Sequence, residues 1–316
     1  MPISISMYAA VLPMLLYLFI LWKMDKYDRE PLSMILFHFL WGAFGAVLLG
    51  IGGSLTLVIL LSLTGNNSQL NYLIQSVLIA PVTEEFAKGI ILFFTIRTRR
   101  FDNITDGLVY GGAVGLGFGM TENFLYFITF GNTITSWIYI VIIRSLFSAV
   151  MHCIASGIFG ASLGLSKFSE NSFRKLFPVG GILLAILIHF SWNASVMFAG
   201  TYLLGILFII LSVILFIFIF NLSLSNERRI ITQELQEECG SGLIPLEHIN
   251  ILNGSLRFKR GWIDEHVRKV YCRNAIRLAF NKYELRRVKG SRRQFYEKEI
   301  ELNRDVIRIL LSNIRK

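Results

Sequence analysis

The sequence predicts an all-α protein: a polytopic membrane helix bundle of about seven spans, followed by a small helical cytosolic domain. The 316 residues are 54% hydrophobic and only 16% charged, whereas a typical soluble domain is about 25% charged. Long apolar segments recur through residues 1–224, and a spanning helix needs about 20 such residues. This composition excludes an ordinary soluble enzyme and a disordered chain.

Seven apolar segments are candidates for the spanning helices. The second is longer than a span requires, so we expect it to enter through an interfacial turn near Pro31. The spans are predicted at residues 6–21, 31–63, 71–96, 106–130, 137–165, 177–199 and 202–224.

The charges between the spans predict their orientation. Basic residues follow the first, third, fifth and seventh spans, within residues 23–29, 97–100, 167–175 and 228–229. The other three connections carry no charge. Because cytoplasmic loops are rich in Lys and Arg, we expect a multi-pass protein of the cell membrane, with its N-terminus outside and its C-terminal domain in the cytoplasm.

A change in composition predicts two domains, residues 1–224 in the membrane and residues 225–316 as a basic cytosolic extension. The extension holds 20 of the 31 basic residues and 12 of the 21 acidic ones. Its pattern predicts helices at 226–238, 263–288 and 292–314, with breaks at Gly240-Ser241-Gly242 and Asn253-Gly254. Basic residues near a bilayer can bind anionic lipid, and no motif supports binding of nucleic acid.

Ionisable side chains lie inside four of the predicted spans, where they are costly and usually functional. With a rise of about 1.5 Å per residue, Glu84, Glu85, His152 and His189 fall close to the membrane midplane. Glu122 lies about 6 Å toward the outer face. Carboxylates and imidazoles thus meet in one layer, although polar contacts that only join helices are the alternative explanation.

Spacing within two of these helices indicates water-mediated hydrolysis of a carbonyl. Lys88 shares a helix face with Glu84 and Glu85, so it can neutralise one carboxylate and leave the other to act as a general base on water. His189 and Asn193 are four residues apart, so together they can donate hydrogen bonds to an oxyanion.

Two other features favour structural roles. Arg144 in the fifth span is best explained as a partner for Glu122. The fourth span carries a small-xxx-small stripe, for which we favour close helix packing over a groove for substrate. Its members are Gly107, Gly111, Gly115 and Gly119.

Four motifs occur in order on successive spans: EEFAK at 84–88, FGMTEN at 118–123, His152 alone, and HFSWN at 189–193. No HExxH, GxSG or GxGD motif of other intramembrane hydrolases is present. Together these motifs resemble the PrsW family of glutamic intramembrane proteases, and residues 25–31 look like the family's cytoplasmic turn. More distantly, they are similar to CAAX prenyl proteases, whose second motif ends in histidine.

The resemblance implies an intramembrane endopeptidase that cleaves membrane-anchored proteins, such as anti-sigma-factor-like substrates. It implies that Glu84 activates water, that His152 orients it, and that His189 with Asn193 stabilises the oxyanion. The implied catalytic set is Glu84, Glu85, Glu122, His152, His189 and Asn193, supported by Lys88, Phe118 and Asn123. Since hydrolysis needs water, these residues should line a wet cavity connected to one membrane face.

Two alternatives stay open at this point. A zinc-dependent hydrolase would use Glu84, Glu122, His152 and His189 as ligands. A non-enzymatic proton-coupled transporter or receptor would use the glutamates to relay protons. For the favoured hypothesis we expect no cofactor and no nucleic acid, with a membrane-anchored protein substrate, the bilayer and anionic lipid as partners.

Overall fold

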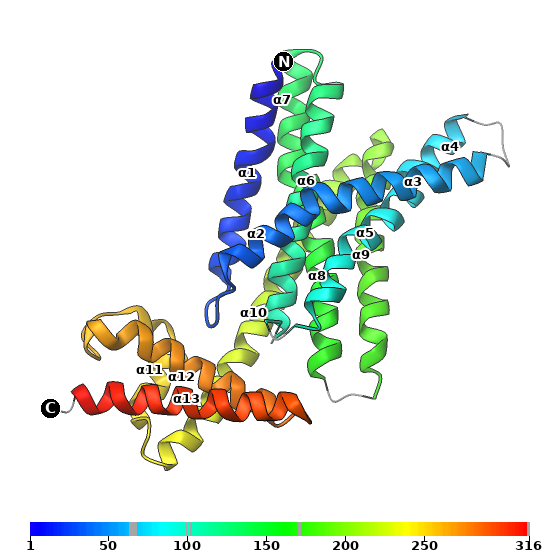
Figure 1. The fold of residues 1–316 in the computed structure, drawn as a ribbon. Helices are drawn as coiled ribbons and strands as arrows, with labels where there is room; N and C mark the ends of the chain where they lie inside the picture. Colours follow the sequence, from blue (N-terminus) through cyan, green and yellow to red (C-terminus); the bar gives the residue numbers. More distant parts are fainter. Residues whose placement is uncertain (63–67, 99, 102, 170–171, 315–316) are drawn as a thin grey trace. The chain divides into compact units, whose positions relative to one another are not determined.

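The computed structural model of the protein describes residues 1–62, 68–98, 100–101, 103–169 and 172–314. The end of the predicted second span, at residue 63, and Arg99 in a predicted basic loop lie outside the described residues. The described residues form helices and turns and include no strand, so the all-α prediction is confirmed. The chain divides into unit 1, which is Met1–Asp25 with Arg29–Phe220, and unit 2, which is Lys26–Asp28 with Asn221–Lys316 (Figure 1).

Unit 1 is a bundle of apolar helices joined by short connections. Its helices are α1 (Ile3–Met24), α2 (Leu32–Leu40), α3 (Val47–Ser62), α4 (Ser68–Ile74), α5 (Ala80–Thr95), α6 (Ile104–Phe130), α7 (Ile134–Ile143), α8 (Ala149–Phe168), α9 (Phe177–Met197) and the first part of α10 (Tyr202–Gly240). The short 3₁₀ turns η4 (Arg174–Leu176) and η5 (Ala199–Thr201) precede α9 and α10.

In the described part of the chain, three π-helical segments join pairs of these helices into longer runs. They are η1 (Trp41–Ala46) between α2 and α3, η2 (Gln75–Ile79) between α4 and α5, and η3 (Arg144–Ser148) between α7 and α8. Such wide turns often occur at functional sites. Here two of them present main-chain carbonyls to side chains, because Ala43 O accepts from Thr121 Oγ1 and Ser76 O accepts from Asn193 Nδ2.

Among the described residues, five helices are long and apolar enough to cross a membrane. They are Ile3–Met24, Leu32–Leu61, Ile134–Phe168, Arg174–Met197 and Tyr202–Gly240. The other two predicted spans, at 71–96 and 106–130, are also helical but carry most of the ionisable residues of the candidate site. The count of seven spans therefore stays a prediction.

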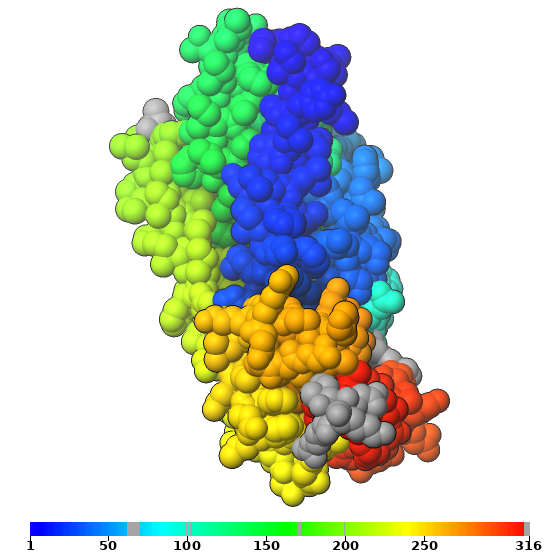
Figure 2. Space-filling view, turned by 90° about the vertical axis from the view of Figure 1, so that its left-hand side faces the viewer, coloured from blue at the N-terminus to red at the C-terminus, as the bar shows by residue number. Residues whose placement is uncertain are grey.

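The outer face of α1 is apolar and uncovered, as expected for a helix in contact with lipid. Figure 2 shows this helix in dark blue along one side of unit 1. Large side chains such as Leu12, Leu16 and Phe19 are exposed there, whereas Met14 and Leu18 face inward and are buried.

Helix α6 is the core of unit 1, because every residue from Thr105 to Gly119 is buried. The glycine stripe packs directly on α8. A Cβ at Gly111 would overlap the carbonyl of Ser156, and a Cβ at Gly115 would overlap that of His152. The close-packing interpretation of the stripe is thus confirmed, and it places the backbone of α8 against that of α6.

Unit 2 is helical and has its own apolar core. It contains the second part of α10, α11 (Leu246–Leu252), the 3₁₀ turn η6 (Ser255–Phe258), α12 (Glu265–Leu285) and α13 (Ser291–Ile314). The two last helices lie within three residues of their predicted ends. The helix predicted at 226–238 is not separate, because α10 is continuous to Gly240 and no Gly or Pro lies between Gly205 and Gly240. The predicted domain boundary at 224 therefore falls inside a helix.

The three residues of the loop after α1 belong to unit 2. Tyr27 donates its hydroxyl hydrogen bond to the carbonyl of Asn253 at 2.7 Å. Arg257 Nη2 donates to the carbonyl of Lys26 at 2.8 Å, and its guanidinium stacks 4.3 Å from the Tyr27 ring. Unit 2 is therefore completed by a segment more than 200 residues away in sequence.

A buried ionic cluster joins three helices of unit 2 at Glu238. Its carboxylate accepts from Lys282 Nζ at 2.6 Å and from Arg304 Nη2 at 2.7 Å. Burial alone would raise the pKa of Glu238, but the hydrogen bonds and charges of Arg304 and Lys282 hold this pKa below its usual value. A carboxylate with a lowered pKa in the folded state stabilises that state above the unfolded pKa, and the effect is lost as pH falls through the folded value.

We expect Glu238→Gln to lower the free energy of unfolding of unit 2 by about 1.5–3 kcal/mol at neutral pH, because it removes charge-assisted hydrogen bonds. The wild-type advantage should shrink as pH falls below the unfolded carboxyl pKa of about 4.3. Thermal unfolding of the full chain in detergent, followed by circular dichroism, measures both. The control is Glu297→Gln, which alters an exposed pair with Arg293. Equal stability of E238Q and wild type at pH 7 would contradict a stabilising role of the ionised Glu238.

We expect Gly115→Ala to destabilise unit 1 by about 1–3 kcal/mol, because the added methyl group overpacks the α6–α8 contact. Gly180→Ala in α9 is the matched control, since nothing lies within 4 Å of its added Cβ. The comparison is the thermal midpoint of the two variants in detergent. If G115A unfolds at the same temperature as G180A, the contact between Gly115 and the His152 carbonyl does not exclude a methyl group, and the prediction is wrong.

Candidate active site

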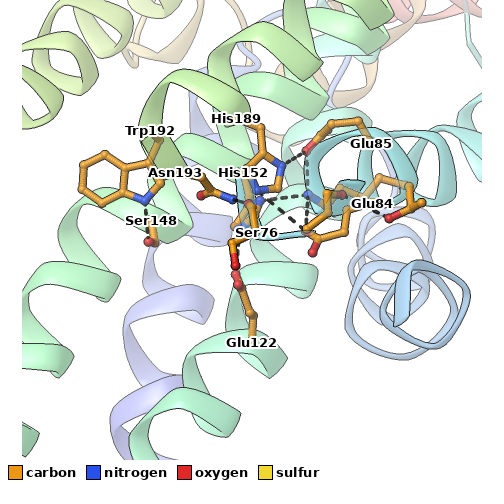
Figure 3. A network of polar contacts seen from close by, with 12 residues as sticks. Ser76, Glu84, Glu85, Glu122, Ser148, His152, His189, Trp192 and Asn193 are labelled. Atoms are coloured by element: carbon orange, nitrogen blue, oxygen red, sulfur yellow. Dashed lines mark hydrogen bonds and ion pairs between the residues drawn. The ribbon is translucent and has the colours of Figure 1, made fainter. Parts of the chain in front are cut away.

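Four helices of unit 1 direct polar side chains to one place inside the bundle. Glu84 and Glu85 come from α5, Glu122 from α6, His152 from α8 and His189 from α9 (Figure 3). The two imidazole rings stand edge to face with centroids 4.7 Å apart. The structure thus brings together the five ionisable residues that the sequence predicted to share one layer of the membrane.

Lys88 lies at the centre of this cluster and is 1% exposed. Its Nζ is 2.7 Å from Glu85 Oε1 and 2.8 Å from His152 Nδ1, but 3.9 Å from Glu84 Oε2. The same Nζ also lies over the ring of Phe118, 3.9 Å from the ring centroid. The carboxylate that Lys88 neutralises is therefore that of Glu85.

Each histidine is held through one nitrogen by a carboxylate. Since an ammonium only donates, His152 accepts from Lys88 at Nδ1 and donates from Nε2 to Glu122 Oε2, at 2.7 Å. His189 donates from Nδ1 to Glu85 Oε1 at 2.9 Å. A neutral His189 then presents its Nε2 as an acceptor.

Glu84 differs from Glu85 in being open on one side. Glu85 is 1% exposed, whereas the side chain of Glu84 is 16% exposed. Within the described residues, Glu84 Oε2 makes no hydrogen bond, and it lies 3.8 Å from His189 Nε2. Glu84 Oε2 is thus a buried acceptor without a donor, while the rest of the side chain is partly exposed.

Arg144 anchors the far side of the cluster. Its Nη2 lies 2.7 Å from Glu122 Oε2, and its Nε donates to Asn123 Oδ1 at 3.1 Å. The guanidinium also stacks 3.6 Å from the ring of Tyr126. The prediction that Arg144 pairs with Glu122 is confirmed, and Asn123 contacts the cluster through Arg144.

Asn193 stands apart from the carboxylate–histidine cluster. Among the described residues it hydrogen-bonds through Nδ2 to the carbonyl of Ser76 in η2, at 2.9 Å. The neighbouring Trp192 donates to Ser148 Oγ in η3 at 2.8 Å (Figure 3). These bonds fix α9 against two π-helical segments, and they leave Asn193 the second hydrogen of its amide.

Ser156 also contacts this cluster, although the motifs of the sequence did not indicate it. Its buried hydroxyl donates to Glu85 Oε2 at 3.4 Å, so both oxygens of this carboxylate are held. The signal was present in the spacing, because Ser156 follows His152 by four residues and shares its helix face.

A cavity of about 640 Å³ lies beside the cluster. Glu84, Glu122, His152 and Asn193 are among the residues that line it. It continues to Phe130 at the end of α6 and to Tyr202 at the start of α10. Four of the six predicted catalytic residues therefore line this cavity, whereas Glu85 and His189 are not among its lining residues.

The same side chains fit a metal ion by their chemistry. Glu84, His152 and His189 offer three ligand atoms that all lie within 4.8 Å of one another, as a catalytic site with three protein ligands requires. Each histidine also hydrogen-bonds to a carboxylate through its other nitrogen, an arrangement typical of metal-bound imidazoles. Lys88 now donates to His152 Nδ1, so a metal bound through that nitrogen would displace it. Glu122, a ligand in the zinc hypothesis, lies outside this trio.

Comparison with known proteins identifies the family of the chain. The family described as PrsW family intramembrane metalloprotease matches residues 30–222. Protease PrsW of Oceanobacillus iheyensis is 31% identical over 189 residues, which cover 58% of this chain and 80% of that protein. Protease PrsW of Geobacillus kaustophilus is 30% identical over 182 residues, covering 57% and 75% respectively.

Protease PrsW of Bacillus subtilis is 29% identical over 186 residues, covering 58% of this chain and 79% of that protein. No solved structure matches the chain significantly. The matched segment contains every residue of the candidate site and ends within α10. The chain therefore belongs to the PrsW family of intramembrane proteases.

Proposed function

We propose that this protein hydrolyses peptide bonds of membrane-anchored proteins, such as anti-sigma-factor-like substrates, with Glu84 as the base that activates water. The observation that carries the proposal is the difference between the two adjacent glutamates. Lys88, His189 and Ser156 hold Glu85, whereas the Glu84 side chain is partly exposed and lines the cavity, and its Oε2 has no hydrogen bond among the described residues. Family membership supports a protease over the proton-coupled transporter or receptor.

The proposed reaction uses one carboxylate twice. The oxygen of the water attacks the scissile carbonyl carbon while Glu84 accepts a proton from that water. A tetrahedral oxyanion forms. The C–N bond then breaks as Glu84 returns the proton to the leaving amine. Asn193 lines the cavity, and in this proposal its second amide N–H stabilises the oxyanion.

The geometry favours a positioning role for His189. Its Nδ1 donates to Glu85, so a neutral ring can accept from the water at Nε2 but cannot donate to an oxyanion. Glu122 and Lys88 fix both nitrogens of His152, which makes this ring a rigid wall of the site. These roles refine the expectation that His189 acts together with Asn193.

A metal ion would be held by Glu84, His152 and His189. When bound, it would supply Lewis acidity that polarises a carbonyl and activates water near neutral pH. Glu85 and Glu122 would then orient the two imidazoles through the hydrogen bonds that they already accept.

We propose that substrate and water enter from the outer side of the cell membrane. The basic connections support a multi-pass chain with the N-terminus outside and the C-terminal domain in the cytoplasm. In that orientation the end of α6, the start of α10 and the cavity between them lie in the outer half of the bilayer. The scissile bond should then lie near the outer end of the substrate's membrane segment.

We expect Glu84→Gln to lower the cleavage rate by about 10²–10⁴-fold, because an amide cannot accept the proton of water. The measurement compares new termini of membrane proteins, by mass spectrometry, between cells that carry the variant and cells that carry the wild type. The position of these termini also tests the outer-side cleavage. The matched control is Glu301→Gln, an exposed glutamate of unit 2. Unchanged termini in E84Q cells, with termini present in the wild type, would contradict the role of Glu84.

We expect activity of the purified protein to survive strong chelators, because the Lys88 ammonium supplies positive charge at the site and occupies His152 Nδ1. The readouts are cleavage of a substrate identified from the new termini and the metal content of the same sample. Loss of activity that Zn²⁺ restores would favour the metal-dependent version. In that case His189→Ala should also lose the bound metal.

A further inference from the structure

One face of unit 2 combines exposed positive charge with exposed apolar side chains. It adjoins the loop formed by Lys26–Asp28, which Arg257 and Arg277 contact. Phe258 is 57% exposed and Leu256 is 44% exposed, and both lie in or beside η6. The exposed basic residues of this face, here called the loop-binding face, are Lys259, Arg260, Arg273 and Arg277.

Contacts within unit 2 tie these residues to the loop. Arg257 stacks between the rings of Tyr27 and Phe258, at 4.3 and 4.6 Å. Arg277 Nε lies 3.9 Å from Asp28 Oδ1. These contacts hold Arg257 and Arg277 at the loop, and residues 256–260 lie next to it because they are the chain neighbours of Arg257.

The three residues of the loop are held at the membrane surface by covalent connection. Tyr27 follows Met24, the last residue of the candidate span α1, by three positions. An extended chain covers at most about 3.6 Å per residue, so Tyr27 lies within about 11 Å of the end of that span. The next candidate span begins at Leu32. Whatever binds this loop is thus at the depth of lipid headgroups, where side chains with an apolar body and a charged end are stabilised.

We propose that the loop-binding face binds the headgroups of anionic phospholipids in the bilayer that holds the protein. Lys259 and Arg260 attract the phosphates, and Phe258 with Leu256 enters the interface between headgroups and acyl chains. Each Lys or Arg near an anionic surface strengthens binding by about fivefold. This inference is independent of the proposed protease activity, because it concerns residues outside the matched family segment.

The test is hydrogen–deuterium exchange of the full-length protein in nanodiscs of phosphatidylcholine, with or without phosphatidylglycerol. In the wild type, we expect amides of residues 255–262 to exchange at least about fivefold more slowly when phosphatidylglycerol is present. High salt should weaken this protection, since screening shortens the range of surface charge. The double variant Lys259→Glu with Arg260→Glu should remove it.

The matched control reverses two exposed lysines elsewhere in unit 2, by Lys289→Glu with Lys298→Glu, and should keep the protection. Circular dichroism establishes whether the variants stay folded, and the milder pair Lys259→Gln with Arg260→Gln gives an intermediate effect in a stable protein. Equal exchange in both lipids, or protection that survives K259E/R260E, overturns the proposal. Binding of a fluorescent oligonucleotide in place of lipid would also overturn it.

Discussion

The candidate site depends on neutralising the Lys88 ammonium inside an apolar bundle. A charge removed from water must be paired and hydrogen-bonded, and Glu85 and His152 satisfy this requirement at 2.7 and 2.8 Å. The same contacts decide which nitrogen of His152 carries the proton. They also make two adjacent glutamates different, because one is committed to the lysine and the other faces the cavity. The difference between Glu84 and Glu85 thus arises from the Lys88 ammonium.

Rigid backbone contacts hold the groups around this cation. Gly115 lies against the carbonyl of His152, so the distance between His152 and Glu122 is set by two packed helices. The π-helical segments serve the same purpose on the other side, where Ser76 O accepts from Asn193. Main-chain groups in hydrocarbon have no water to bind, so a widened turn must find a side-chain partner. This requirement fixes α9 beside η2.

Sequence predicted the layer of ionisable residues, because charge inside an apolar helix is costly and helix rise converts residue number into depth. The pairing of Lys88 was not predictable, since spacings of three and four place both Glu84 and Glu85 within its reach. The continuity of α10 was also missed, because a change from apolar to charged residues ends a membrane span without ending a helix. The π-helical segments and the docking of Tyr27 have no local sequence pattern.

The inclusion of Lys26–Asp28 in unit 2 has a consequence for the order of biogenesis. Tyr27 is synthesised 226 residues before its partner Asn253, a delay of about 10–45 s at ordinary translation rates. Throughout that interval the spans can insert, while the first loop is still without its partners. A nascent chain that ended at residue 224 would contain the whole candidate site and leave this loop uncovered. This loop therefore leaves the ribosome long before its partners and reaches its final contacts late.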